Sequence, residues 1–215
     1  MIDFHTHTLL SDGRLLPAEQ ARRAAVAGYR ALGLADHVDA STIGLVVPVL
    51  VSAARSESAE GGLRVVPCAE LTHVRPEQIG RIVAEARRLG ARIVLAHGET
   101  IAEPVAPGTN RAAIEAGVDI LAHPGRISEA DAEAAAGRGV YLEITCKAGH
   151  SLTNGCVAAM ARKCGAKLVF GTDAHGPGDF ATRRKAVDVL AGAGLDDSEI
   201  DGVFENMAAI LREKG

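Results

Sequence analysis

The stretch Ile2-Asp-Phe-His-Thr-His7 opens the chain with a short apolar run that ends in two histidines. A short apolar run that gives way to polar residues is typical of a buried strand. The next apolar run, Ala31–Ala35, ends in a similar way, in Asp36-His37. The return of this order along the chain decides the fold class.

Seven apolar runs alternate with longer amphipathic segments over the whole chain. We predict strands at residues 2–4, 31–35, 63–69, 92–96, 119–122, 140–145 and 167–170. We predict helices at residues 17–28, 47–59, 76–89, 110–116, 128–136, 154–163, 180–191 and 197–213. Such alternation predicts a parallel sheet with right-handed crossovers and helices outside it. A nearly closed barrel and an open doubly wound sheet both agree with this order.

The composition is that of an ordinary globular domain. The 215 residues are 47% hydrophobic and 23% charged, so we expect a single domain over residues 1–215 with a sizeable core. The formal net charge is -4, the aromatic content is 3%, and there is no tryptophan. This balance argues against long nucleic acid as a partner, because such partners require a basic face or aromatic stacking platforms.

The cysteines and the N-terminus favour an intracellular location. None of the four cysteines forms a Cys-x-x-Cys pair, and we expect plain thiols in a reducing compartment. The first residues contain no basic region with a long apolar run, so no signal peptide is predicted. No stretch of about 20 apolar residues exists, so no membrane-spanning segment is predicted. We therefore expect a cytoplasmic protein.

Histidines and carboxylates collect at the carboxyl ends of the predicted strands. Six of the eight histidines lie there, and only His73 and His150 do not. The strand-end side chains are His5, His7, His37, Glu70, His97, His123, Asp173 and His175. In a parallel barrel all these ends open on one face, where active sites are built. An open sheet would spread them too widely for one cluster, so we predict an α/β fold, a distorted (βα)7 TIM-like barrel.

Imidazole and carboxylate side chains together suit zinc, manganese and iron. Asp12, in the Ser-Asp-Gly loop after the first predicted strand, adds a further oxygen ligand. Nine candidate ligands are too many for one ion and, with bridging carboxylates, would fill two or three sites. Burying so many imidazoles without partners would be costly, which argues against a core role. We predict two or three divalent metal ions, Zn, Mn or Fe, at this face.

The order of these motifs resembles that of the PHP (polymerase and histidinol phosphatase) family. The segment His5-Thr-His-Thr-Leu-Leu-Ser-Asp-Gly13 looks like its first motif, and Asp36-His37 resembles its second. The later motifs are matched in order by Glu70, His97, His123-Pro124 and Gly171-Thr-Asp-Ala-His175. The resemblance covers nearly the whole chain. It implies a seven-stranded distorted barrel and a cluster of up to three metals.

Carried over position by position, the resemblance implies three metal sites and their ligands. The first would be held by His5, His7, Glu70 and Asp173. The second would be held by Asp12, His37 and His175. The third would take His97 and His123, with Glu70 as a bridging ligand. The catalytic roles fall to Glu70, Asp173 and His175.

Several cationic side chains near this face are candidates for substrate binding. Arg126 follows His123-Pro-Gly, and its planar guanidinium suits a pair of phosphate oxygens; the alternative is a surface arginine that caps the next helix. Arg14, after Asp12-Gly13, is a second candidate. Lys147 and His150, in the polar stretch after the sixth predicted strand, would contact substrate or relay a proton. The alternative for that stretch is a polar loop with a helix cap at Asn154.

Other polar residues are expected to support the site. Asp36 is expected to orient a ligand imidazole rather than bind metal. Glu143 alternates within the sixth predicted strand and would need a partner if it points into the barrel. The loop Glu99–Asn110 would form another wall, and its proline and glycine content indicates a fixed shape. His73 is expected near the site or at the surface.

The pattern favours hydrolysis of a phosphate ester. Neighbouring metals would lower the pKa of a bridging water and bind the oxygens of a phosphate. We therefore infer a phosphoesterase that hydrolyses a small phosphate monoester by metal-activated hydroxide. Histidinol phosphate is the substrate that the resemblance names, but the short loops leave little sequence for a dedicated pocket.

Three alternatives stay open at this point. One is a nucleotide phosphodiesterase or nuclease, which the resemblance also allows for a short substrate. Another is a non-catalytic barrel that binds metal, against which stands the presence of every expected ligand. The last is a metal amidohydrolase, but no lysine ends a middle strand as a carbamylated bridge would require.

Overall fold

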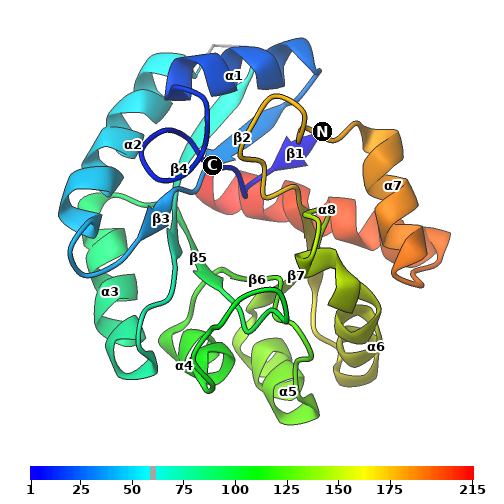
Figure 1. Cartoon of the computed structure of the whole chain (residues 1–215). Helices are drawn as coiled ribbons and strands as arrows, with labels where there is room; N and C mark the ends of the chain where they lie inside the picture. The colour runs from blue at the N-terminus through cyan, green and yellow to red at the C-terminus, as the bar shows by residue number, and fades with distance from the viewer. Residues whose placement is uncertain (59–61) are drawn as a thin grey trace.

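The strands form one parallel sheet that curves into a nearly closed barrel in the computed structural model of the chain (Figure 1). The structure describes residues 1–58 and 62–215. The strands are β1 (Ile2–Asp3), β2 (Ala31–Leu34), β3 (His37–Val38), β4 (Arg64–Leu71), β5 (Ile93–His97), β6 (Ile120–Ala122), β7 (Tyr141–Thr145) and β8 (Leu168–Gly171). Their order in the sheet is β1-β2-β4-β5-β6-β7-β8, with β3 paired to β4. The prediction of an α/β barrel rather than an open sheet is confirmed.

The helices surround the strands (Figure 1). They are α1 (Pro17–Val26), α2 (Ile43–Glu57), α3 (Pro76–Leu89), α4 (Thr109–Ala116), α5 (Glu129–Arg138), α6 (Asn154–Cys164), α7 (Arg183–Gly192) and α8 (Asp197–Lys214), with a 3₁₀ turn η1 (His150–Thr153). Helix α2 begins at Ile43, before the predicted start at residue 47, so Pro48 lies inside it. Burial of Ile43, Val46 and Leu50 outweighs the backbone hydrogen bond that the proline removes. Its predicted end, Ala59, lies outside the described residues.

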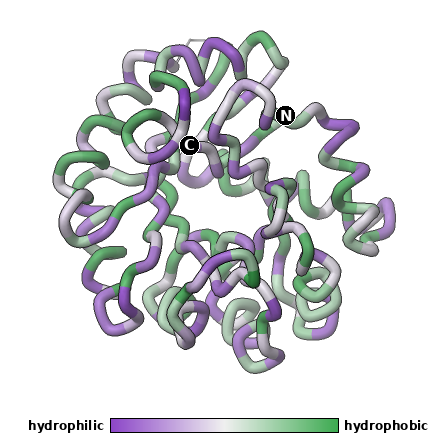
Figure 2. Tube along the Cα trace, in the orientation of Figure 1, coloured by the Kyte–Doolittle hydropathy of each residue, from purple (hydrophilic) through white to green (hydrophobic). Residues whose placement is uncertain are grey.

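Buried apolar residues on the strands and on the helices form one core, and Figure 2 shows hydrophobic and hydrophilic residues alternating along the helices that surround the strands. Helix α3 is representative, because its buried residues Ile79, Ile82, Val83 and Ala86 recur at the spacing of one helical face. The helix ends at Gly90, whose φ of 107° is one that glycine adopts without steric cost. This packing fixes the strands, and with them the residues that follow each strand end.

The first and last strands of the barrel meet through side chains and one bridge rather than a full ladder. Thr6 and Ala174 form an isolated parallel bridge, and the His7 N–H donates to the Ala174 carbonyl at 2.8 Å. The buried carboxylate of Asp3 accepts hydrogen bonds from the hydroxyl and the N–H of Thr172. Burial raises the pKa of Asp3 to about 7, although these hydrogen bonds oppose the shift. The seam therefore places the loops after β1 and β8 next to each other.

Helix α8 covers the amino ends of the strands, and Figure 1 shows it in red crossing behind the barrel. The Asn206 side chain donates to the carbonyl of Leu168, the first residue of β8, at 2.9 Å. Lys214 at the end of α8 pairs with Asp119, which precedes β6. With this end covered, the opposite face, at the carboxyl ends of the strands, is the one that stays open.

Within the part of the chain that the structure describes, no helix combines the length and apolar character needed to cross a bilayer.

Candidate metal centre

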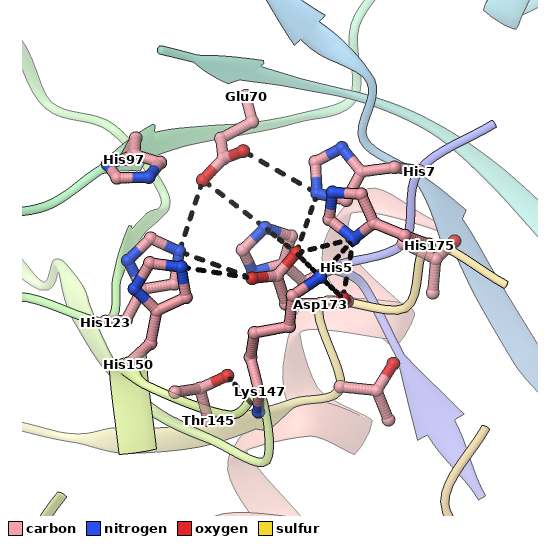
Figure 3. A network of polar contacts seen from close by, with 12 residues as sticks. His5, His7, Glu70, His97, His123, Thr145, Lys147, His150, Asp173 and His175 are labelled. Carbon is pink, nitrogen blue, oxygen red and sulfur yellow. Dashed lines mark hydrogen bonds and ion pairs between the residues drawn. The ribbon is translucent and has the colours of Figure 1, made fainter. Parts of the chain in front are cut away.

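The strand-end histidines and carboxylates meet in one cluster at the carboxyl ends of the strands (Figure 3). His97 is the last residue of β5, and His123 follows β6 directly. Asp173 and His175 come from the loop after β8. The barrel therefore brings together side chains that are up to 170 residues apart in sequence, as His5 and His175 are.

The first group of ligand atoms comes from the loop after β1 and from β4. One nitrogen each of His5 and His7 and one oxygen of Glu70 lie within 4.8 Å of one another. The Nε2 atom of His7 lies 3.1 Å from Oδ1 of Asp173, and Nε2 of His5 lies 3.3 Å from Oε1 of Glu70. All four side chains are buried. These are the residues that the resemblance implied for the first metal.

The second group surrounds Asp12, which the sequence placed in the loop after the first strand. Its ligand atoms come from His7, Asp12, His37 and His175 and lie within 4.8 Å of one another. The two oxygens of Asp12 face different imidazoles: Oδ2 lies 3.1 Å from Nε2 of His175, and Oδ1 lies 3.4 Å from Nε2 of His37. The implied second set is thus brought together, and His7 is shared with the first group.

The third group consists of His97, His123 and His150, whose ligand nitrogens also lie within 4.8 Å of one another. The rings of His123 and His150 stack with centroids 4.2 Å apart. The Nδ1 atom of His150 lies 2.7 Å from the Thr100 hydroxyl, which fixes the imidazole. His150 was predicted from the sequence to contact substrate. Its position beside His97 and His123 makes it a further ligand candidate.

Glu70 occupies the centre of the cluster. Its Oε1 atom lies 3.3 Å from Nε2 of His5 and 3.6 Å from Nε2 of His123. Its Oε2 atom lies 2.8 Å from Nδ1 of His37. Because β3 pairs with the end of β4, the strand runs past its predicted end at Ala69, and Glu70 lies within it. A rigid strand thus holds a carboxylate whose two oxygens face different groups, as a bridging ligand requires.

Buried polar atoms without hydrogen bonds show that the cluster fits metal ions. Among the described residues, Nε2 of His5, both ring nitrogens of His7, Oε1 of Glu70 and Nδ1 of His123 are buried and make no hydrogen bond. Each such atom costs about 1–3 kcal/mol when it is left unpaired. Imidazole nitrogens and carboxylate oxygens converging in this way are the donor set of zinc, manganese and iron sites.

The charges of the cluster are strongly coupled. Burial opposes ionisation of His5, but the carboxylates of Glu143, Glu70 and Asp173 outweigh it and raise its pKa well above the ordinary value. Burial would raise the pKa of Glu70, but His5 and His37 outweigh it and hold that pKa well below its usual range. Burial lowers the pKa of His123 well below the ordinary value, which leaves a neutral imidazole available as a ligand.

Two of the clustered residues have strained backbones. His123 has a φ of 28° and Asp173 a φ of 51°, values that non-glycine residues seldom adopt. Such conformations cost about 1–3 kcal/mol each and persist where the surroundings enforce them. The strain turns both side chains toward the cluster, which is typical of a functional site.

Glu143 is the residue in strand β7 for which the sequence required a partner, and that partner is His5. Its Oε2 atom lies 2.6 Å from Nδ1 of His5, and both side chains are buried. The opposite nitrogen of the His5 ring faces Glu70. A Cβ at Gly171 on β8 would lie 2.5 Å from the same Glu143 oxygen, so only glycine leaves room for it.

Asp36 does not orient an imidazole in the described structure, and that prediction is wrong. Its carboxylate accepts hydrogen bonds from the N–H of Thr8 at 2.8 Å, the hydroxyl of Thr8 at 2.9 Å and the hydroxyl of Ser11 at 2.7 Å. Asp36 therefore fixes the loop that carries Asp12. The reason is geometric: β1 pairs with β2, and the Ala35 N–H donates to the Thr6 carbonyl at 2.8 Å, so the loop after β1 lies over the end of β2.

A cavity of about 160 Å³ opens over the cluster. Its lining includes Asp12, His37, His97, Glu103, Lys147, His150, Asp173 and His175. The Lys147 ammonium donates to the carbonyl of Asp173 at 3.1 Å and lies 2.6 Å from Nδ1 of His175. The predicted substrate contacts Lys147 and His150 therefore both face this cavity.

The two arginines predicted to contact substrate lie differently. Arg14 is exposed beside the cluster, and its N–H donates to the carbonyl of His175 at 2.7 Å. Arg126 is also exposed, and it does not line the cavity over the cluster. Gly125 packs against the backbone of Glu99, and the chain reaches the surface at Arg126. The structure thus gives no support to phosphate binding by Arg126.

Glu103 is a further acidic residue at the site, and the sequence pattern did not indicate it. It lies in the loop Glu99–Asn110, which was expected only to form a wall. Its Oε2 atom lies 3.2 Å from Nε2 of His97 and 3.1 Å from Nε2 of His73. An acidic residue in a loop directly after a ligand-bearing strand is the signal that could have identified it. Through Glu103, His73 lies at the edge of the site.

Comparison with known structures agrees with the fold. An amidohydrolase crystal structure has a TM-score of 0.62 and 15% identity, covering 98% of this chain and 74% of that one. A protein assigned as histidinol phosphatase hisK from Listeria monocytogenes has a TM-score of 0.56 and 10% identity, covering 85% of this chain and 98% of that one. The fold and the cluster thus define a TIM-like α/β barrel with a histidine–carboxylate centre at its strand ends.

A curated relative shows the family more narrowly. The chain is 42% identical over 204 residues to the uncharacterized protein MJ1295 of Methanocaldococcus jannaschii, and the match covers 94% of each chain. The chain therefore belongs to the family of MJ1295. No family model matches the chain.

Proposed function

We propose that this protein is a metal-dependent phosphoesterase that hydrolyses a small phosphate monoester. One observation carries the proposal: buried imidazole nitrogens and carboxylate oxygens converge without hydrogen-bond partners below an open cavity. Donor atoms of these types, left unpaired in a buried position, fit divalent cations. The cavity of about 160 Å³ has room for a phosphate group beside them.

The residues that would hold the ions form three sets. A first ion would be held by His5, His7, Glu70 and Asp173, and a second by Asp12, His37 and His175. A third would be held by His97, His123 and His150, with Glu70 as a bridge. When bound, Zn, Mn or Fe would supply a nucleophile from water near neutral pH and neutralise charge on phosphate oxygens. Asp173 and His175 are proposed catalytic residues because they line the cavity, and Glu70 because its Oε1 atom lies between His5 and His123 as a bridge.

Lys147 would bind a phosphate oxygen directly. Its ammonium group lines the cavity, is held by the Asp173 carbonyl, and lies 3.9 Å from Oδ1 of Asp173. A lysine is a compact point charge, which suits a phosphate oxygen. At the end of β7 the Thr145 N–H donates to Oδ1 of Asn154, and the side-chain amide of Asn154 donates to the Thr145 carbonyl. These two hydrogen bonds fix the start of the loop that carries Lys147.

The choice of phosphate over amide bonds rests on the site. The PHP-like order of motifs supports a phosphatase. The likenesses to an amidohydrolase and to a protein assigned as a histidinol phosphatase are both likenesses of fold. Cationic Lys147 and nearby Arg14 favour a substrate with negative charge. We further propose that the protein acts on a small phosphorylated compound in the cytoplasm, without long nucleic acid as a partner.

A substrate panel tests the proposal. The purified protein, supplied with Mn²⁺ or Zn²⁺, is assayed with p-nitrophenyl phosphate, bis(p-nitrophenyl) phosphate and p-nitroacetanilide, and bound metal is measured on the same sample. We expect turnover of the monoester, its loss after treatment with EDTA and its return with metal. Turnover of the diester alone would identify a phosphodiesterase, and turnover of the anilide alone an amidohydrolase. Bound metal without any turnover would indicate a non-catalytic barrel.

A further inference from the structure

A second cavity, of about 430 Å³, adjoins the metal centre. It shares Lys147 and His175 with the smaller cavity over the cluster. Its remaining walls come from the loops after β1, β7 and β8 and from the start of α7, including Arg14, Asp179, Phe180 and Lys185. We call this space the side cavity. If the phosphate group of a substrate lies over the ions, the remainder of the substrate would lie beside or within the side cavity.

The side cavity is lined by more cations than anions. Arg14, Lys147 and Lys185 contribute three positive charges, and Asp179 is its one acidic side chain. Oδ2 of Asp179 is already engaged, because it accepts the His175 N–H at 2.9 Å. Neither Arg14 nor Lys185 forms an ion pair with any residue in the described parts of the chain. The excess positive charge is therefore available to a ligand.

The walls of the side cavity are held in place without a ligand. The backbone of Arg14 is tied to His175, and Gly176 leaves room for its side chain, since a Cβ there would lie 3.3 Å from Cδ of Arg14. On the other side, the Tyr29 hydroxyl donates to the Ala181 carbonyl at 2.9 Å and accepts its N–H at 3.0 Å. The ring of Phe180 packs edge-on against that of Tyr29, with centroids 5.7 Å apart. A site with fixed walls loses little entropy on binding.

We propose that the side cavity binds a second anionic group of the substrate, so that the protein prefers phosphate monoesters that also carry a carboxylate or another phosphate. The inference rests on the proposed phosphatase function and adds the class of substrate. Arg14 and Lys185 would pair with the second anion, while Lys147 lies between the two subsites. A substrate that carries an ammonium group in place of the second anion, such as histidinol phosphate, is disfavoured because the same charges repel it.

Matched substrates test this inference. Glycerol 3-phosphate and 3-phosphoglycerate differ at one carbon. The first carries a hydroxymethyl group where the second carries a carboxylate. We expect kcat/KM for phosphoglycerate to exceed that for glycerol phosphate by about tenfold, since a charge-assisted contact is stronger than a neutral one. Histidinol phosphate should be the poorest of the three. Equal values for all three, or a preference for histidinol phosphate, would overturn the inference while leaving the phosphatase function intact.

Two variants on α7 locate the effect. Lys185→Gln removes a charge that lines the side cavity, whereas Arg184→Gln removes the neighbouring charge, which does not line it. We expect Lys185→Gln to reduce the ratio of kcat/KM between phosphoglycerate and glycerol phosphate about fivefold, and Arg184→Gln to leave the ratio unchanged. The same loss in both variants would point to a general surface charge and would contradict a defined subsite.

A binding measurement separates this inference from the proposed function. Phosphonopropionate and propylphosphonate cannot be hydrolysed at their C–P bond and differ in a terminal carboxylate. Calorimetry with the Mn²⁺-supplied protein should give a Kd about tenfold lower for phosphonopropionate. If no monoester is turned over but this difference is found, the phosphatase function fails and the anion subsite stands. If turnover is found without a difference in kcat/KM or Kd, the subsite fails.

Discussion

The Nδ1 atom of His5 lies 2.6 Å from Oε2 of Glu143, and both side chains are buried. His5 lies in the loop after β1 and Glu143 lies in β7, 138 residues apart in sequence. The contact fixes the His5 ring so that Nε2, which makes no hydrogen bond, faces Glu70. A carboxylate behind a ligand imidazole sets its tautomer and raises its basicity. Glu143 is therefore a positioning residue for the proposed first metal.

Replacing Glu143 by glutamine should weaken metal binding without unfolding the protein. The amide keeps the shape of the side chain but removes the charge that orients the His5 imidazole. We expect the affinity for Mn²⁺ or Zn²⁺ to fall about 10–100-fold, as is typical when the outer partner of a ligand histidine is lost. Isothermal titration calorimetry of Glu143→Gln measures the change. Glu133→Gln, an exposed change on α5, is the matched control and should bind metal like the wild type.

Gly171 tests the same relationship from the neighbouring strand. In Gly171→Ala the new methyl group would lie 2.5 Å from Oε2 of Glu143, so the carboxylate has to move. We expect a loss of about 1–3 kcal/mol in the free energy of unfolding, together with weaker metal binding. Urea unfolding of Gly171→Ala, with Gly192→Ala at an open position as control, gives the stability change. The double variant Gly171→Ala/Glu143→Ala should regain part of the lost stability but not the metal affinity. If the two changes in the free energy of unfolding were fully additive, a direct contact between residues 171 and 143 would be contradicted.

The fold could be predicted from local patterns because each strand is a short apolar run and each helix has one apolar face. Helix α3 was predicted with the bounds that the structure shows. Helix α2 was misplaced because Pro48 resembles a helix start, and only the packing of Ile43 and Val46 makes the earlier turn favourable. The short β3 was not predicted, since it exists only through its pairing with the end of β4.

The cluster could be predicted because ligand residues must follow strands that open on the same face. Nothing in the local sequence reveals which strand-end residues support others, because such contacts depend on tertiary structure. Asp36 and Glu143 show this, since the roles of bracing a loop and orienting His5 follow from the β1–β2 pairing and from the β7–β8 pairing. The location of Arg126 was similarly beyond reach, as it depends on how Gly125 packs on Glu99.

Asp173 combines backbone strain with a proposed ligand role, which allows the two to be separated. Asparagine adopts left-handed backbone conformations readily, so Asp173→Asn should keep the φ of 51° while it removes the negative charge. We expect nearly complete loss of phosphatase activity and of tightly bound metal, with a thermal unfolding curve close to that of the metal-free wild type. Activity assays, metal analysis and circular dichroism on one preparation test this. Retained activity would exclude Asp173 from the proposed centre.

Asp119 links the closing helix α8 to the barrel. Its Oδ2 atom accepts the Val94 N–H at 2.7 Å and lies 3.2 Å from Nη1 of Arg87, and its other oxygen pairs with Lys214. Asp119→Ala leaves the Val94 N–H without its acceptor, so we expect a loss of about 2 kcal/mol in the free energy of unfolding. Urea titration measures it. Because Asp119 lies at the opposite end of the barrel from the metal centre, the number of bound metal ions should stay unchanged.

His150 is the residue whose role the structure changed most, and its variant tests the third metal site. In His150→Phe a ring can still stack on His123, as the native rings do at 4.2 Å, but no nitrogen remains to bind an ion. We expect the third ion to be lost or to bind at least about tenfold more weakly, as for loss of a ligand, while the first two sites keep their metal. Metal analysis after gel filtration reports the number of ions bound. His73→Phe removes an imidazole that pairs with Glu103 and lies 5.3 Å from the His97 ring but belongs to none of the ligand groups, and it should keep the wild-type number. If both variants bind as many ions as the wild type, His150 is no ligand, and its nitrogen, 3.9 Å from Oδ2 of Asp173, returns to the role of a substrate contact.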